Sequence, residues 1–357
     1  MATVTKTIGT NSRDYSTMTA WEADLDNTGV YDTGDDAVGE CYPDGTFDET
    51  VTINGGATSG LNSIKLKASD EHPHKGVAGA GVKLVCSSPM TGANVAVIGV
   101  WSNRAVTIEN LEITDVSFAS GYNANVIAVF SSNTPNAVLS RMLIHDITGP
   151  GSPSGGRLRI YFGESDADLL NWFCYDCKAE YGNMQFLYPS SSGTTEAYNC
   201  SVLDISAPNG NSLDGFFNNG SLINVKNCIC CVSAAGASSS EDYTPAGSSW
   251  DYNISADATA TGTNSIASQT PSNVFVSTTS GSENLHILAT SNAVKNGINL
   301  TNTPAGVLWD IDGRPRPSTR WDIGADQISF AASALERKLK LSYMNSLSLG
   351  DNSLASF

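Results

Sequence analysis

The sequence has little positive charge. It contains 19 lysines and arginines against 36 aspartates and glutamates, which gives a formal net charge of -17 at pH 7. A surface with this excess of negative charge repels phosphate backbones and anionic lipid headgroups. We therefore expect neither nucleic acid nor a membrane among the partners of this protein.

Long hydrophobic runs are also missing. No stretch approaches the roughly 18 uninterrupted apolar residues that a membrane-spanning helix needs. Residues 1–8 lack the basic segment and the apolar run of a secretory signal. We therefore expect no membrane span and no Sec-dependent export. Hydrophobic residues still make up 40% of the chain and charged residues only 15%, a composition that supports a buried core rather than disorder.

Histidine is scarce, and motifs for zinc or nucleotide binding are missing. The His72-Pro-His74 pair has only Glu71 beside it at a spacing suited to a metal ligand, so we interpret it as a surface loop. The glycine-rich stretch 76–81 lacks the Lys-Ser/Thr ending of a phosphate-binding loop. We therefore expect no cofactor and no bound metal.

Five segments of the sequence align with one another without gaps. Their sixth residues are 23 to 35 residues apart, a spacing typical of structural repeats that stack into a solenoid and place insertions in loops. The segments are VTIENLEITDV (106–116), AVLSRMLIHDI (137–147), WFCYDCKAEYG (172–182), TEAYNCSVLDI (195–205) and INVKNCICCVS (223–233). The spacing predicts one elongated repeat domain.

Three columns of this alignment are apolar, namely the third, the sixth and the eighth. Strand side chains alternate between faces, so the third and sixth positions both face inward only if the chain turns between them. The fifth column supplies the turn, because Asn tolerates a left-handed backbone better than most residues. The sixth column contains Leu111, Met142, Cys177, Cys200 and Cys228. The fifth contains Asn110, Arg141, Asp176, Asn199 and Asn227.

This pattern of strand, Asn corner and strand resembles the Asn-rich bend of right-handed parallel β-helix proteins of the pectate-lyase type. The resemblance covers residues 90–330 as weak repeats, and it implies a fold without implying an activity. The predicted fold class is therefore all-β, a right-handed parallel β-helix (solenoid). A β-sandwich with strands every ~8 to 12 residues is the alternative, but it gives no reason for stacked columns at this repeat length.

Both ends of the repeat region are expected to be capped. In residues 16–25, Ser16 is a candidate N-cap, and Met18, Trp21 and Leu25 share one helical face. A short helix there would cover the open first rung. The opening segment TIGTNSRDYSTMTAWEADL resembles the start of β-helix proteins of tailed phages. We divide the chain into a cap with the first rungs (1–90), a β-helix body (91–327) and a tail (328–357).

The body ends on the segment DIDGRPRPSTRWDIGADQ, residues 310–327. It resembles the Asp-Gly-Arg-Pro-Arg-Pro…Asp-Ile-Gly-Ala motif that closes many bacterial β-helix surface proteins, with Gln327 where an acidic residue is usual. Its charges are expected to form local ion pairs that fix an irregular turn and cap the last rung. These charges are Arg314, Arg316, Arg320, Asp310, Asp312, Asp322 and Asp326.

Eight cysteines include Cys174-x-x-Cys177 and Cys228-x-Cys230-Cys231, a spacing that binds zinc in other proteins. Here cysteines fill the sixth column, where a free thiol acts as a small buried apolar group. We therefore expect core packing in place of zinc. A disulfide between neighbouring rungs stays open, because rungs lie about 4.8 Å apart.

The tenth column contains Asp115, Asp146 and Asp204. Carboxylates on adjacent rungs could act as an acid–base pair, or bind calcium if further oxygens converge. We prefer a turn-capping role, because a ladder of turn acids needs no substrate. The three aspartates are therefore catalytic candidates only in the enzyme alternative.

A second candidate patch follows a Gly/Pro/Ser loop. Arg157 and Arg159 precede Glu164, Asp166 and Asp168, and a catalytic arginine near acids is one arrangement that pectin-cleaving relatives would imply. The other strings that the resemblance would imply, Asn-Thr-Asp and Gly-His-Gly, are absent. Enzyme activity is therefore the less favoured expectation.

The tail has a different character from the body. One face of its predicted helix is apolar, and the same stretch adds positive charge to an acidic protein. This face is expected to pack along the solenoid or to dock on a partner. The predicted docking residues are Leu335, Arg337, Lys338, Leu339, Lys340 and Tyr343.

These features favour a non-enzymatic structural protein on the virion surface of a tailed phage, such as a capsid decoration protein or a fibre component. A β-helix without an export signal suggests release by lysis. The expected partners are capsid or tail proteins and sister subunits, in a homo-oligomer such as a trimer. The alternatives are a carbohydrate-active β-helix, either an extracellular lyase or hydrolase or a tailspike depolymerase, and an adhesin-like bacterial surface module.

Overall fold

The computed structural model describes residues 2–328 apart from short gaps. The chain divides into two units, residues 1–327 and residues 328–357, and the boundary expected at residue 90 falls inside the first. The predicted docking residues from Leu335 to Tyr343 lie outside the described residues, so the docking role of the tail stays a prediction. The gaps are residues 93, 120–122, 131–134, 150–155, 191–192, 211, 221, 233–236, 245–249, 302 and 305.

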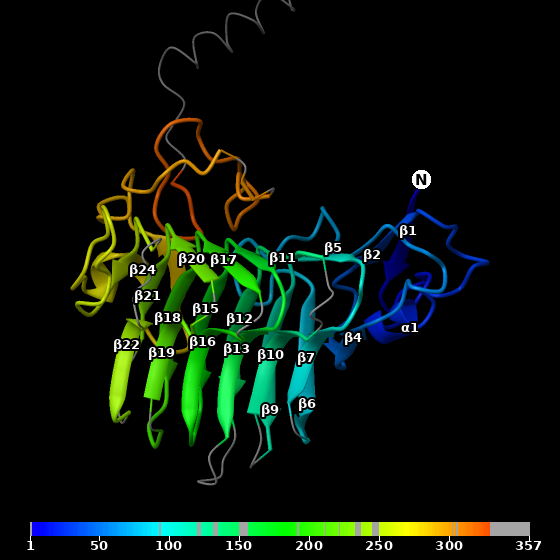
Figure 1. The fold of residues 1–357 in the computed structure, drawn as a ribbon, viewed down its shortest axis with the longest axis horizontal. Helices are drawn as coiled ribbons and strands as arrows, with labels where there is room; N and C mark the ends of the chain where they lie inside the picture. The colour runs from blue at the N-terminus through cyan, green and yellow to red at the C-terminus, as the bar shows by residue number, and fades with distance from the viewer. Residues whose placement is uncertain are drawn as a thin grey trace, which may run out of the picture. The chain divides into compact units, whose positions relative to one another are not determined.

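Three parallel sheets run along the first unit, and the strands of sheet C lie side by side in Figure 1. Sheet A consists of β1 (Thr3–Ile8), β2 (Asp36–Cys41), β5 (Ser63–Ala68), β8 (Ala105–Glu109), β11 (Ala137–Ser140), β14 (Ala167–Leu170), β17 (Thr194–Tyr198) and β20 (Leu222–Lys226). Sheet B consists of β3 (Phe47–Asp48), β6 (Lys83–Met90), β9 (Glu112–Phe118), β12 (Leu143–Thr148), β15 (Phe173–Lys178), β18 (Ser201–Ser206), β21 (Ile229–Cys231) and β23 (Ile254–Ser255). Sheet C consists of β4 (Val51–Ile53), β7 (Val95–Val100), β10 (Asn123–Val129), β13 (Arg157–Gly163), β16 (Asn183–Pro189), β19 (Ser212–Phe217) and β22 (Ser239–Thr244).

Through most of the unit, each turn of the chain contributes one strand to each sheet. A strand pairs in parallel with the strand of the same sheet in the next turn, as Leu139 does with Leu169 in sheet A and Ile144 with Cys174 in sheet B. The protein is therefore an all-β parallel solenoid of about eight turns, which confirms the predicted architecture at this level.

The predicted left-handed corner lies between sheet A and sheet B. Asn199 Nδ2 donates to Asn171 Oδ1 at 3.1 Å, and Asn227 Nδ2 donates to Asn199 Oδ1 at 3.1 Å. The buried amides therefore form a ladder that joins neighbouring turns. The corner residues, with their positive φ, are Asn110 (62°), Arg141 (50°), Asn171 (60°), Asn199 (55°) and Asn227 (55°).

The sequence alignment is wrong for the third repeat. It places Asp176 at the corner, but Asn171 occupies that position. The aligned segment of this turn is therefore residues 167–177 in place of residues 172–182. Asp176 also has a positive φ, of 47°. Both left-handed columns favour Asn and Asp, so a gapless alignment can slip from one column to the other.

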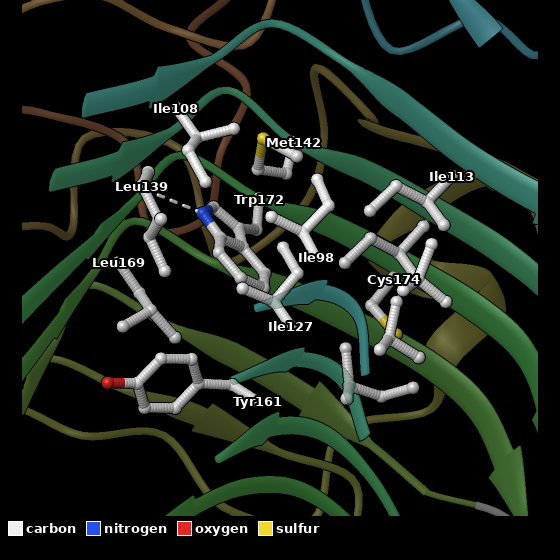
Figure 2. Close-up of a cluster of buried hydrophobic side chains, with 14 of the residues drawn as sticks. Ile98, Ile108, Ile113, Ile127, Leu139, Met142, Tyr161, Leu169, Trp172 and Cys174 are labelled. Carbon is white, nitrogen blue, oxygen red and sulfur yellow. Dashed lines mark hydrogen bonds between the residues drawn. The ribbon is translucent and has the colours of Figure 1, made fainter. Parts of the chain in front are cut away.

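The same slip misplaces one core residue. Cys177 is buried, but it pairs with Ile147 and Ile205 in sheet B rather than following the corner. Trp172 follows the corner in this turn, and Figure 2 shows its ring close to Met142 in the interior. Its indole Nε1 donates to the carbonyl of Leu139 at 2.8 Å, which satisfies a buried polar group.

The interior is filled by apolar columns that run along the solenoid (Figure 2). All eight cysteines are buried free thiols, and Sγ of Cys174 lies 3.8 Å from Sγ of Cys177. Burial raises the pKa of the Cys177 and Cys228 thiols, so they behave as neutral packing groups. The predicted core role of the cysteines is confirmed.

A short helix, α1 (Met18–Glu22), lies near the N-terminus. Thr17 caps it, since its side chain accepts from the N–H of Ala20 at 3.0 Å, so the assignment of the cap to Ser16 is wrong. Met18, Trp21 and Leu25 are buried as predicted. The Trp21 ring packs against β2, where only the absence of a side chain at Gly39 leaves it room.

The closing segment 310–327 lies along the flank of the solenoid and not over its last rung. Its contacts are beside the corner: Arg316 Nη2 donates to Asn171 Oδ1 at 3.1 Å, and the N–H of Ala325 donates to Ser201 Oγ at 3.1 Å. The predicted role as cap of the last rung is therefore wrong. The side-chain amides at the corner face outward, so they can form hydrogen bonds with a segment on the flank. The end of the solenoid is instead extended by residues 251–266, which continue the parallel pairing beyond β20 and β21. Between residue 266 and the closing segment, the chain forms a 3-10 helix, η1 (Pro271–Asn273), and an antiparallel pair of strands, β24 (Phe275–Ser277) and β25 (Asn284–Ile287).

Candidate functional site

The predicted column of aspartates runs along sheet B, and it has four members in place of three. Asp115, Asp146, Asp176 and Asp204 each interrupt a strand with a left-handed residue of φ between 47° and 53°. Asp visits this conformation more readily than most residues. The aspartates therefore shape the backbone inside the strands of sheet B. The predicted position, as a cap of the turn that follows the strand, is wrong. Asp176 was missed because of the slipped alignment.

Asp146 lies beside a buried histidine. Its carboxylate is 2.6 Å from Nδ1 of His145, and Nε2 of His145 is 3.0 Å from the carboxylate of Glu112. Burial lowers the pKa of His145, but the hydrogen bonds with Glu112 and Asp146 outweigh it and raise the pKa. Glu112 also accepts from the N–H of Gly79 at 2.9 Å, and Tyr175 stacks on the imidazole at 4.9 Å. This group therefore ties the loop that carries Gly79 to sheet B.

The other aspartates of the column form an acidic strip. Burial raises the pKa of Asp176, and the charges of Asp146, Glu283 and Asp204 raise it further. Lys83 balances the negative charge of Asp115 alone, with its Nζ 3.5 Å from that carboxylate. The structure thus brings the predicted aspartates to one face, as a row along the solenoid rather than as two acids facing each other across a cleft.

The second predicted patch is divided between two sheets. Arg157 and Arg159 belong to β13 in sheet C, whereas Asp168 belongs to β14 in sheet A. Arg159 is buried, and its guanidinium carbon lies 4.2 Å from the ring centroid of Tyr188. The prediction of a single arginine–acid site is therefore wrong, because the chain turns between the two strands.

Asp168 has an environment of its own on sheet A. Burial raises the pKa of Asp168 to about 6, and the negative charges of Glu196 and Asp166 contribute to this rise. A hydrogen bond from Asn136 Nδ2 at 2.5 Å acts in the opposite direction and lowers the pKa. These residues border a groove of about 260 Å³. A pKa of about 6 brings this carboxyl group closer to the range of a general acid than an ordinary aspartate, but every charged neighbour in this groove is another acid.

The His72-Pro-His74 pair is not simply a surface loop. His74 is fully buried, its Nε2 lies 2.7 Å from the carbonyl oxygen of Arg141, and its Nδ1 accepts from the N–H of Gly76 at 2.9 Å. The surface interpretation is wrong for this residue, because sequence alone could not show that the loop folds against the corner. His72 is half-buried and bonds to Ser69.

Another group of potential ligands lies in the C-terminal part of the unit. Ligand atoms of His286, Asp312 and Asp326 lie within 4.8 Å of one another. Arg314 forms ion pairs with both of these aspartates and with Asp310, so its guanidinium already balances the acids that a cation would need. We assign this group the turn-fixing role that the sequence predicts for the closing segment.

A row of five aromatic rings crosses sheet C, and the sequence analysis did not predict it. The rings follow one another at centroid distances of 4.5 to 6.1 Å, one from each of five successive turns. The five repeats that we aligned cover sheets A and B, so the strands of sheet C were never compared. The rings belong to Trp101, Phe130, Phe162, Tyr188 and Phe217.

The row begins at a groove on the side of β4. Trp101 is 53% exposed, and Phe130 stacks on it with ring centroids 4.5 Å apart and planes 22° apart. The groove has a volume of about 390 Å³. Its walls are Thr50, Thr52, Met90, Thr91, Asn94, Val95, Ala96, Gly99, Trp101 and Phe130.

Comparison with protein-family models gives no match to this chain, and neither does a search of curated proteins. Within the part of the chain that the structure describes, no helix has the length and apolar character to cross a bilayer. Two faces of the solenoid thus present candidate functional groups, the aspartate column on sheet B and the aromatic row on sheet C.

Proposed function

We propose that this protein is a non-enzymatic structural protein on the surface of a tailed-phage virion, either a capsid decoration protein or a fibre component. The observation that supports it best is the aspartate column. The acids proposed for the enzyme alternative, together with Asp176, are left-handed residues inside the strands of sheet B in four successive turns. A parallel solenoid in which the same backbone residues recur from turn to turn suits a protein that displays a surface.

The proposed mode of attachment is the C-terminal tail. In the helix that the sequence predicts there, the basic residues Arg337, Lys338 and Lys340 would lie beside an apolar face, whereas the whole chain has a net charge of -17. An acidic surface on a sister subunit, or on a capsid or tail protein, would attract this segment. We further propose that the body is a right-handed β-helix, that α1 covers its N-terminal edge and that the subunits form a homo-oligomer such as a trimer.

The test is a comparison of the full chain with a chain that ends at residue 330. Residues 1–327 form a compact unit without the tail, so the shortened chain should keep its circular dichroism spectrum and its unfolding midpoint. We expect the full chain to co-sediment with particles assembled from the head and tail proteins encoded beside it, and the shortened chain to stay in solution. The proposal fails if the full chain does not bind such particles. Equal binding of both chains would refute attachment through the tail.

The second candidate is a carbohydrate-active β-helix, favoured by the raised pKa of Asp176 beside Asp146. We expect no new reducing ends and no unsaturated products when the protein is incubated with a panel of acidic polysaccharides. Turnover that disappears in Asp146→Asn, and persists in Asp115→Asn at the far end of the column, would establish the enzyme and overturn the non-enzymatic proposal.

A further inference from the structure

Trp101 exposes an aromatic face that the fold does not use. Phe130 stacks on the ring from the side of the next turn, yet 53% of the residue remains exposed. In the preceding turn, β4 places Thr52 beside Gly99 in the register of sheet C. The same register continues to Asn54 beside Trp101. Neither Thr52 nor Asn54 is aromatic, so the face of the indole on this side is not stacked and borders the groove. Leaving a large aromatic surface in water forgoes stabilisation that burial would give.

The position of the indole is set by the backbone beneath it. A Cβ at Gly99 would lie 3.4 Å from Trp101 Nε1 and 3.7 Å from its Cδ1, so the ring rests directly over this glycine. Ala128, the partner of Gly99 in the next turn, is also small. Two small residues in register therefore let the Trp101 and Phe130 rings lie close to the sheet. The ring is held in place before any ligand arrives, which reduces the entropy cost of binding.

The walls of the groove show what kind of ligand would fit. They contain three threonines and Asn94, and none of the residues that line the groove is charged. A charged ligand would find no opposite charge there, and an entirely apolar one would cover hydroxyl and amide groups without replacing their bonds to water. Nε1 of Trp101 has no hydrogen-bond partner among the described residues. The groove therefore suits an uncharged ligand with an apolar face and a rim of hydroxyl groups.

We propose that this groove binds a neutral pyranose unit of a saccharide. The C–H face of the sugar ring stacks on the free face of Trp101, and its hydroxyl groups bond to Thr50, Thr52, Thr91 and Asn94. The aromatic row continues from Phe130 to Phe162 and on to the later turns. The strands of sheet C follow one another along the solenoid axis in Figure 1, so a linear saccharide can extend from the groove in that direction. This inference requires neither the virion nor the tail, and it holds or fails separately from the proposed function.

The experiment is calorimetric titration of the full chain with neutral hexasaccharides of glucose, mannose and N-acetylglucosamine. We expect at least one of them to bind, and Trp101→Ala to weaken that binding at least tenfold. Trp101→Phe should keep part of the affinity, because a smaller aromatic face remains. Gly99→Val should weaken binding as well, because its side chain would displace the indole. The matched control is Trp309→Ala, since Trp309 is 47% exposed but lies outside the groove.

Four results would overturn the proposal. They are no binding of any neutral hexasaccharide by the wild type, unchanged binding by Trp101→Ala, equal losses in Trp101→Ala and Trp309→Ala, and self-association of the wild type that Trp101→Ala abolishes in the absence of saccharide. The last result would identify the groove as a contact between protein chains. Urea unfolding of each variant checks that the fold is intact, and the exposure of Trp101 predicts only a small change.

Discussion

His74 is a residue whose ionisation the fold controls. Its Nε2 lies 2.7 Å from a carbonyl oxygen and therefore bears the proton, while its Nδ1 accepts from Gly76. The neutral tautomer satisfies both partners. Burial lowers the pKa of His74 to about 4, although the hydrogen bond to the carbonyl of Arg141 acts in the opposite direction. A protonated ring would place an unmatched charge in the interior and lose the bond from Gly76.

His74 should make the protein sensitive to acid. Its pKa falls from 6.5 in the unfolded chain to about 4 in the folded one, so its contribution to stability is complete above pH 6.5 and is lost as the pH falls to 4. Each pKa unit between the folded and the unfolded state corresponds to about 1.4 kcal/mol of unfolding free energy. The unfolding free energy should therefore fall by about 3 kcal/mol between pH 7 and pH 4 because of His74. In His74→Gln, the decrease in unfolding free energy between pH 7 and pH 4 should be smaller by about this amount. Urea unfolding at both pH values measures it, and equal decreases in the two proteins would contradict the assignment.

The corner between sheet A and sheet B is the element that sets the repeat. Its left-handed residue redirects the chain, and its side-chain amide bonds to the amide of the next turn. The two tasks are separable, because glycine can take the conformation without the amide, whereas alanine takes it only at a cost. Asn is the residue that provides both.

We predict that Asn199→Ala is less stable than Asn199→Gly by about 1 kcal/mol, because a side chain with Cβ is strained at φ 55°. Both variants should be less stable than the wild type, since both lose the amide bonds to Asn171 and Asn227. Urea unfolding measures the three free energies. The control is the same pair of substitutions at exposed Thr148 in β12, where glycine should be the less stable. The same order at both positions would refute the argument.

At the scale of the whole molecule, residues 297–327 return along the flank and join several turns. Arg316 is buried and donates to Asn171 Oδ1 and to the carbonyls of Gly324 and Ala325 at 2.9 to 3.1 Å. Burial lowers the pKa of Arg316 to about 10. This single guanidinium therefore connects the closing segment to the corner ladder.

Arg316→Ala should release the closing segment without unfolding the solenoid. The variant removes the donor of the Gly324 carbonyl, a cost of about 1 to 3 kcal/mol for one unsatisfied buried group. Asn171 Oδ1 keeps the bond from Asn199, and the Ala325 carbonyl keeps the bond from Ile311. We expect faster amide hydrogen exchange in residues 297–327 and at the corners of β14 and β17, and unchanged exchange in β7 and β10. Arg320→Ala is the control, since Arg320 lies in the same segment and is exposed. Exchange that rises throughout all three sheets would show that the segment is required for the fold.

The sequence by itself determined the architecture, because each feature that it used is local. Apolar positions on either side of a corner residue recur in five successive turns, and this residue is Asn in four of them and Arg141 in the fifth. A strand that alternates between its faces can place both positions inside only by turning at that residue. The same reasoning predicted a backbone role for Asp115, Asp146 and Asp204, but it expected them in turns, whereas they lie inside strands. It failed at Asn171 and Asp176, where two left-handed columns with similar residue preferences lie five positions apart.

Tertiary structure alone decided what the surfaces present. The aromatic row joins residues about 30 positions apart in the sequence, on a sheet whose strands share no obvious motif, and only the parallel register brings Trp101 next to Phe130. Residues 297–327 lie on the flank because the side-chain amides of Asn171, Asn199 and Asn227, from three successive turns, bond to them. The burial of His74 depends on a loop that packs against the corner. The periodicity of a repeat determines how one turn of the chain folds. The contacts between turns depend on how neighbouring strands are aligned with one another, and the sequence of a single repeat does not specify this register.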